Sequence, residues 1–224
     1  MALFGTNGVR GRLDMLTPSL AFDLCASFAS WSKGQTIVLA RDMRLTSPML
    51  HSAAASGIMA AGKDVLDIGL ASSPVAEFTL AGQKADGLVI VTASHNAPEW
   101  NALKFVDEKG AAVSRERGEL IEQSALAKTY AQAGWESAGK LREFPAAAGA
   151  HAKEVIAGVK AAKTKKRKLR IALDFGNGTS SLSRGVFESL GCEVFALNEN
   201  IDGNFPGRPS EPSEANVQQL LKTV

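Results

Sequence analysis

The sequence predicts an α/β fold, with a mixed, mainly parallel sheet that is covered by helices on both faces. Short, continuously apolar runs alternate along the chain with longer segments whose apolar residues recur at helical spacing. A strand that is buried on both faces of a sheet has such a continuous run, whereas a half-exposed strand alternates between apolar and polar residues. Polar loops follow two of the runs, and ligand sites in parallel sheets collect beyond the carboxyl ends of strands.

The elements of the first half are marked by their flanking residues. Thr17 is a capping residue, Pro18 suits the first helical position, and Gly34 ends the segment. Ser47 and Pro48 open a second helix in the same way. In chain order we predict a helix between 17 and 34, a strand at 36–40, a helix at 47–61, a strand at 65–68, a helix from 74, a strand at 88–91 and a helix at 115–130.

The second half has the same strand–loop–helix order on a smaller scale. We predict a helix at 151–162, a strand at 169–173, a helix ending near 190, a strand at 193–197 and a last helix at 216–222. The small-residue stretch 145–150 marks the boundary, which gives domains of residues 1–148 and 149–224. The second domain is too small to close a core well, so we expect it to expose an apolar face that favours self-association.

The composition excludes several classes of protein. The 224 residues are 45% hydrophobic and 21% charged, as in an ordinary globular protein, and the net charge is +2. That balance does not indicate a nucleic-acid partner, and the basic run at 163–170 is interpreted as a solvated linker. No secretory leader and no apolar run of about 18 residues is present, so no membrane span is expected. The two distant cysteines are interpreted as reduced core thiols, and cytoplasmic localisation is expected.

The loop after the strand at 88–91 is the first candidate site, with the sequence TASHN at 92–96. An acyl-transfer nucleophile at Ser94 would need a base and a Gly-x-Ser-x-Gly turn, and the turn motif is absent. A serine that carries a phosphoryl group needs cations and N–H donors instead. The alternative is that Thr92, Ser94 and Asn96 only satisfy the backbone of a turn.

Two glycine-rich loops are weaker candidates. Residues 4–11 (FGTNGVRG) place three glycines around one arginine, which suits close approach of an anion or a simple entry turn. Residues 174–180 (DFGNGTS) lie between a strand and a helix, where backbone N–H groups suit a phosphate. A plain strand-to-helix turn explains this segment as well, and a slight similarity to the first phosphate loop of actin-like kinases gives a further alternative.

Taken together, five segments resemble the α-D-phosphohexomutase family, which comprises phosphoglucomutases, phosphomannomutases and phosphoglucosamine mutases. They occur in the family's order over the whole chain. They are 4–11, similar to the N-terminal signature; RDMR at 41–44, similar to the arginine loop; TASHN at 92–96 with Glu99, Asn101 and Lys104, similar to the phosphoserine loop; and DFGNG at 174–178 and DGNFPGR at 202–208, similar to second-domain segments.

The resemblance implies interconversion of a hexose 1-phosphate and 6-phosphate through a phosphoserine at Ser94 and a hexose 1,6-bisphosphate. Lys104 would assist proton transfer, and Arg10 and His95 would surround the phosphoryl group. A Mg²⁺ ion would be bound through the Ser94 phosphate. The residues expected to bind substrate or phosphate are Thr6, Asn7, Arg41, Arg44, Asn96 and Asn101.

The chain departs from the family pattern at Ala97, where proline is usual, and at Ala102, where glycine is usual. The family has four domains, and its metal loop, sugar-reading loop and distal phosphate loop are expected beyond residue 224. We therefore expect an N-terminal portion that is catalytically incomplete alone and needs C-terminal domains or a complementing chain. The alternative is a non-catalytic phosphosugar-binding or regulatory module. The sequence does not select among glucose, mannose and glucosamine phosphates.

Overall fold

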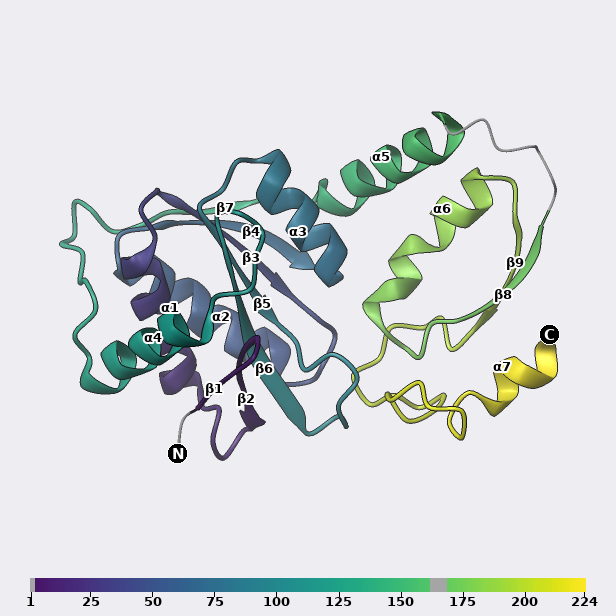
Figure 1. Cartoon of the computed structure of the whole chain (residues 1–224), viewed down its shortest axis with the longest axis horizontal. Helices are drawn as coiled ribbons and strands as arrows, with labels where there is room; N and C mark the ends of the chain where they lie inside the picture. Colours follow the sequence, from purple (N-terminus) through teal and green to yellow (C-terminus); the bar gives the residue numbers. More distant parts are fainter. Residues whose placement is uncertain (1–2, 162–168) are drawn as a thin grey trace.

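Two α/β units, each with its own sheet, make up the structure (Figure 1). The computed structural model describes residues 3–161 and 169–224. The α/β class predicted from the sequence is confirmed. Residues 163–168 of the predicted basic linker lie outside the described residues. Within the part of the chain that is described, no helix is both long and apolar enough to cross a bilayer.

The first unit contains a seven-stranded sheet in the order β1-β2-β6-β5-β3-β4-β7. Strands β5, β3, β4 and β7 pair in parallel, and β6, β2 and β1 extend the sheet with antiparallel pairs. The strands are β1 (Phe4–Gly5), β2 (Gly8–Arg12), β3 (Thr36–Arg41), β4 (Asp64–Leu70), β5 (Gly87–Val91), β6 (Trp100–Asp107) and β7 (Leu141–Glu143).

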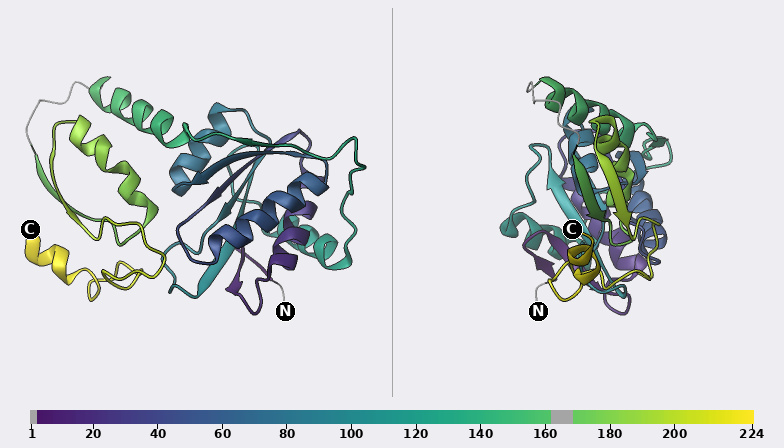
Figure 2. Two further views of the ribbon diagram at one scale, coloured as in Figure 1. Left: turned by 180° about the vertical axis from the view of Figure 1, so that it is seen from behind. Right: turned by 90° about the vertical axis from the view of Figure 1, so that its right-hand side faces the viewer.

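Helices cover both faces of this sheet, as predicted (Figures 1 and 2). The helices of the first unit and the one that leaves it are α1 (Pro18–Trp31), α2 (Ser47–Ala60), α3 (Ser73–Gly82), α4 (Arg115–Ala127) and α5 (Ala147–Ala161). One core lies between the sheet and α1, α2 and α4, and the other includes α3 and the start of α5. The predicted cap is present, because Thr17 Oγ1 accepts from the Leu20 N–H at 3.2 Å.

Four strands were not predicted. The glycine-rich segment at 4–11 is a β1–β2 hairpin, in which Gly8 has φ +129° and a Cβ would collide with the Leu103 carbonyl. Strand β6 was missed because Asn101 and Lys104 interrupt its apolar run. Short β7 is exposed and has no apolar signature. Helix α5 also begins at Ala147 rather than 151, since the alanines before it are strong helix formers.

The second unit is small and its core is thin. Strands β8 (Arg170–Asp174) and β9 (Glu193–Leu197) pair in parallel, with a 3₁₀ turn at Thr179–Ser183 and helices α6 (Arg184–Ser189) and α7 (Gln218–Thr223). Four large apolar side chains of this unit are between 42% and 54% exposed: Leu169, Leu182, Phe195 and Leu221. Self-association through this surface stays a prediction.

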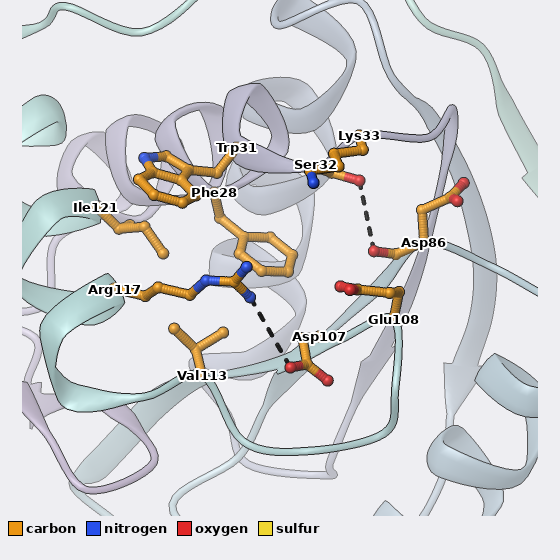
Figure 3. A pocket seen from close by; sticks show the side chains of 10 residues that line it. All are labelled: Phe28, Trp31, Ser32, Lys33, Asp86, Asp107, Glu108, Val113, Arg117 and Ile121. Atoms are coloured by element: carbon orange, nitrogen blue, oxygen red, sulfur yellow. Dashed lines mark hydrogen bonds and ion pairs between the residues drawn. The ribbon is translucent and has the colours of Figure 1, made fainter.

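A hollow of about 60 Å³ lies at the amino end of β5, between α1 and α4 (Figure 3). The Arg117 guanidinium is part of its lining, 5.6 Å from the Trp31 ring centroid and 3.9 Å from the Asp107 carboxylate. Since β5 delivers Ser94 at its carboxyl end, this hollow and the predicted site lie at opposite ends of the strand. The contacts of Arg117 therefore tie α4 to α1 and the end of β6.

Candidate active site

Ser94 lies three residues beyond fully buried β5, in an exposed turn. The hydroxyl of Thr92 accepts from the Ser94 N–H at 3.0 Å, and the Ala93 carbonyl accepts from the Asn96 N–H at 3.1 Å. Ser94 itself has φ +58°, a left-handed conformation that a non-glycine residue adopts at a cost of about 1–3 kcal/mol. Thr92 therefore satisfies the backbone of the turn with its side chain. Ser94 instead is held in a strained conformation with its side chain exposed.

The side chain of Ser94 has a nitrogen partner within its own loop. The Ser94 Oγ and the His95 Nδ1 are 3.2 Å apart, within hydrogen-bond reach. Arg10, on β2, donates from Nη1 to the Asn96 Oδ1 at 2.8 Å. The structure therefore brings together four of the predicted site residues from two segments that are far apart in the sequence.

Arg44 is fully buried and fixes the course of this loop from beneath. Its Nη2 donates to the carbonyls of Ser94 and Asn96 at 3.0 and 2.7 Å. Its Nη1 donates to the carbonyls of Ala97 and Trp100 at 2.7 and 2.9 Å. The Nε donates to the Asp42 carboxylate at 3.1 Å. All five guanidinium N–H groups are thereby used inside the protein, which favours a positioning role over the phosphate contact expected for Arg44.

Asn101 also faces the interior and not a ligand. It is 3% exposed, and its Nδ2 donates to the hydroxyls of Thr46 and Ser47 at 2.9 Å each. The Ser47 hydroxyl in turn donates to Asp42 at 2.5 Å. These bonds join β6 to the start of α2, so Asn101 stabilises the base of the site and is not placed to contact phosphate.

A second group of predicted residues lines a hollow of about 350 Å³ beside the β1–β2 hairpin: Thr6, Asn7, Arg10 and Lys104. Half-buried Lys104 lies on β6, between Gly8 of β2 and Ile90 of β5. Burial lowers its pKa, and the positive charge of Arg10 lowers it further, while Glu77 and Asp42 oppose the shift. A lysine with a lowered pKa exchanges a proton more readily near neutral pH.

We expect Lys104 to titrate at lower pH than the exposed lysines, in NMR spectra of lysine labelled at the side chain. Replacing Arg10 by glutamine removes a neighbouring positive charge, so the pKa of Lys104 should rise towards its ordinary value of 10.5. Because burial lowers this pKa more than Arg10 does, the pKa of Lys104 should stay below 10.5 in the Arg10→Gln variant. Arg12→Gln is the matched control, because Arg12 is exposed like Arg10 and lies two positions further along β2. It should leave the titration of Lys104 unchanged. A Lys104 titration that coincides with those of exposed lysines contradicts the prediction.

Between the two units lies a groove of about 380 Å³, lined by Ser94 and His95 and by residues of both units. The second unit contributes Thr179, Ser180 and Arg208, the last held by Asp174 with an Nε–Oδ2 distance of 2.6 Å. Burial raises the pKa of Asp174, but hydrogen bonds from Asn198, Arg208 and the Gly176 N–H outweigh it and lower that pKa. The carboxylate thus stays charged and fixes the arginine at the groove.

Sequence reasoning missed two residues that touch the Ser94 loop from the second unit. The Ser210 hydroxyl is shared between the carbonyls of His95 and Asn96, at 2.8 and 2.7 Å. The Glu211 Oε2 lies 3.4 Å from the His95 Nε2. No local pattern around Ser210 or Glu211 indicates these contacts, because their partners are more than a hundred positions away.

The remaining expectations concern Arg41 and the two positions that depart from the family pattern, Ala97 and Ala102. Arg41 ends β3, where its Nη1 donates to the Asp42 carbonyl at 3.2 Å. Ala102 lies inside β6 opposite Arg10 and does not have a positive φ, so an alanine is compatible with the backbone there. Ala97 likewise does not have a positive φ, and its carbonyl accepts a hydrogen bond from Arg44.

Comparison with known proteins decides the family. The model of the family described as "Phosphoglucomutase/phosphomannomutase, alpha/beta/alpha domain I" matches residues 1–132, and that of domain II matches residues 150–224. The chain belongs to the phosphoglucomutase/phosphomannomutase family. The resemblance found in the sequence is thereby confirmed.

Relatives in this family are mutases by name. A "Probable phosphoglucosamine mutase" of Methanopyrus kandleri is 36% identical over 223 residues, which are 99% of this chain and 48% of that protein. A "Phosphoglucomutase/phosphomannomutase" of Thermococcus kodakarensis is 33% identical over 99% of this chain and 50% of its own length. The chain therefore spans about half the length of the curated relatives that it matches.

Solved structures of the family have the same fold. A phosphoglucomutase/phosphomannomutase family protein of Burkholderia thailandensis superposes with a TM-score of 0.86 at 28% identity, over 99% of this chain and 49% of that one. A protein of Thermus thermophilus described as a putative phosphomannomutase has a TM-score of 0.82 at 23% identity, over 98% of this chain and 51% of that one, and shows the fold alone.

The described residues do not supply a ligand set for the Mg²⁺ ion that the family implies. Within residues 3–161 and 169–224, no three His, Cys, Asp or Glu side chains come together as a metal site. Magnesium prefers several oxygen ligands in octahedral geometry, which one serine or its phosphate does not supply. No catalytic step is therefore assigned to a metal in this chain.

Proposed function

We propose that this chain carries the phosphoryl-transfer serine of a phosphohexomutase. The observation that supports the proposal is the conformation of Ser94: exposed, left-handed, and held by hydrogen bonds to the carbonyls of its own loop. Backbone strain that surrounding contacts maintain is a feature of functional sites. The whole protein would interconvert a hexose 1-phosphate and 6-phosphate, where the hexose is glucose, mannose or glucosamine.

In the proposed transfer, the bond between Ser94 Oγ and phosphorus breaks while a sugar hydroxyl oxygen bonds to phosphorus. The hydroxyl loses a proton and Ser94 Oγ gains one, so no proton is consumed overall. Lys104, with its lowered pKa, is the proposed acceptor of the hydroxyl proton. Arg10 is proposed to stabilise the charge on the transferring group, because it lies next to Asn96 at the edge of the loop.

Four other predicted residues have separate proposed roles. Thr6 and Asn7 line the hollow with Lys104 and are proposed to contact substrate. Arg44 and Asn101 are proposed to position the loop, since their donors are engaged inside the protein. A Mg²⁺ ion beside the phosphoserine would take its remaining ligands from groups that the described residues do not supply. Steady turnover is therefore expected from the complete protein, with the C-terminal domains or a complementing chain present.

Incubation with radiolabelled glucose 1,6-bisphosphate tests the proposal in this chain. We expect label to appear on the peptide that contains Ser94 after digestion and mass spectrometry. Binding of the bisphosphate without label would overturn the proposal and favour a non-catalytic phosphosugar-binding module. Absence of both binding and label would contradict both functions.

A further inference from the structure

We propose that Glu211 and Ser210, from the second unit, are positioning residues for the phosphoryl-transfer site. Glu211 orients the His95 imidazole and Ser210 holds the backbone on which that ring is mounted. The inference rests on the proposed function of Ser94, and extends it to two residues that have no role in the site so far.

The His95 ring requires an anchor besides Ser94. Its side chain is 54% exposed, and its Nδ1 lies 3.2 Å from the Ser94 Oγ. An exposed side chain that is held at one atom changes rotamer on the picosecond to nanosecond timescale. The Glu211 carboxylate lies 3.4 Å from Nε2, on the opposite side of the ring. The imidazole is thus placed between the serine hydroxyl and the carboxylate.

The carboxylate also selects the state of the ring. An ionised carboxylate has no proton to donate, so its negative charge favours the N–H on the ring nitrogen next to it, which is Nε2. In a neutral imidazole the other nitrogen is then left with a lone pair. That nitrogen is Nδ1, which faces the Ser94 hydroxyl. Glu211 therefore favours the tautomer in which Ser94 donates to His95.

Ser210 fixes the distance between Glu211 and the loop. Its hydroxyl is shared between the carbonyls of His95 and Asn96, while Arg44 holds the carbonyls of Ser94 and Asn96 from the first unit. The Arg44 guanidinium is itself covered by Phe205 of the second unit, 5.2 Å from the ring centroid. The second unit therefore contacts Arg44 through Phe205, the loop backbone through Ser210, and the His95 ring through Glu211.

The test compares Glu211→Ala with Glu214→Ala, and Ser210→Ala with Ser213→Ala, in the full 224-residue chain. The control side chains are exposed and form no hydrogen bond or ion pair with the described residues. Rates of Ser94 labelling by radiolabelled glucose 1,6-bisphosphate are measured together with its Kd. We expect Glu211→Ala to slow labelling between about tenfold and a hundredfold with Kd unchanged, because misplaced reacting groups lose rate. Ser210→Ala should slow it several-fold, and both controls should match the original chain.

A spectroscopic measurement separates positioning from general stabilisation. Nitrogen-15 spectra of the imidazoles are simple to assign, because the chain has three histidines. At alkaline pH we expect His95 to carry its proton on Nε2 and to show NOEs from the ring to the Ser94 Cβ protons. In Glu211→Ala the two ring nitrogen shifts should move towards each other and the NOEs should weaken, while His51 and His151 stay unchanged.

The outcomes distinguish the two proposals. Equal labelling rates for Glu211→Ala and Glu214→Ala would overturn the role of Glu211, and so would a slower rate fully explained by a weaker Kd. If the original chain takes no label at all, the proposed function fails, and the His95 spectra alone then decide the positioning role. Unchanged ring shifts and NOEs in Glu211→Ala would overturn it in that case.

Discussion

Replacing Arg44 by alanine is expected to lower the free energy of unfolding by about 3–5 kcal/mol, as for loss of one partner from a buried ion pair. The side chain is fully buried, and its removal leaves the Asp42 carboxylate without its cation. Four loop carbonyls also lose a donor. Since small domains have a total stability of about 5–15 kcal/mol, this is a large fraction.

The measurement is urea unfolding followed by tryptophan fluorescence, because Trp31 and Trp100 lie in the first unit. Arg142→Ala is the control, since this arginine lies on exposed β7. We expect the control to change stability by less than about 0.5 kcal/mol, as for ordinary surface positions. An Arg44→Ala protein as stable as the control would contradict the role of Arg44 in fixing the loop. Arg44→Lys should also be strongly destabilised, because an ammonium group has three donors and cannot reproduce the planar fork.

Substitutions at Ser94 are expected to separate its chemistry from its backbone conformation. Ser94→Ala and Ser94→Gly both remove the hydroxyl, so neither should take label from glucose 1,6-bisphosphate. Glycine has no Cβ and adopts the left-handed region without penalty. Because Ser94 has φ +58°, Ser94→Gly should be more stable than Ser94→Ala by about 1 kcal/mol.

The same urea measurement and the labelling assay check both parts of this prediction. Ser56→Ala, which removes an exposed hydroxyl from helix α2, is the control and should be labelled at the original rate. Label retained in Ser94→Ala would place the phosphoryl group on another residue. Equal stability of the alanine and glycine variants would show that the left-handed turn relaxes when the hydroxyl is lost.

Strand–helix order was predictable where a local pattern carries it. Strand β3 follows from the apolar run at 36–40, and the start of helix α1 follows from Thr17 and Pro18. Each signal lies in a few adjacent residues, and both elements form as expected. Strand β6 lacks such a pattern, because Asn101 and Lys104 interrupt its apolar residues. Pairing with β5 on one side and β2 on the other makes it a strand, and both partners are distant in the sequence or lie across the turn.

The importance of the loop at Ser94 could be inferred from the sequence, since a buried run that stops at polar residues marks the functional edge of a sheet. The different roles of Arg10 and Arg44 could not be inferred from it. Arg10 and Arg44 are alike in composition, yet one is exposed beside Asn96 and the other is buried with all five donors engaged. The contacts of Ser210 and Glu211 with His95 join residues about 115 positions apart. Local sequence encodes helices, strands and turns, whereas burial and hydrogen-bond partners at such separations depend on how the chain packs.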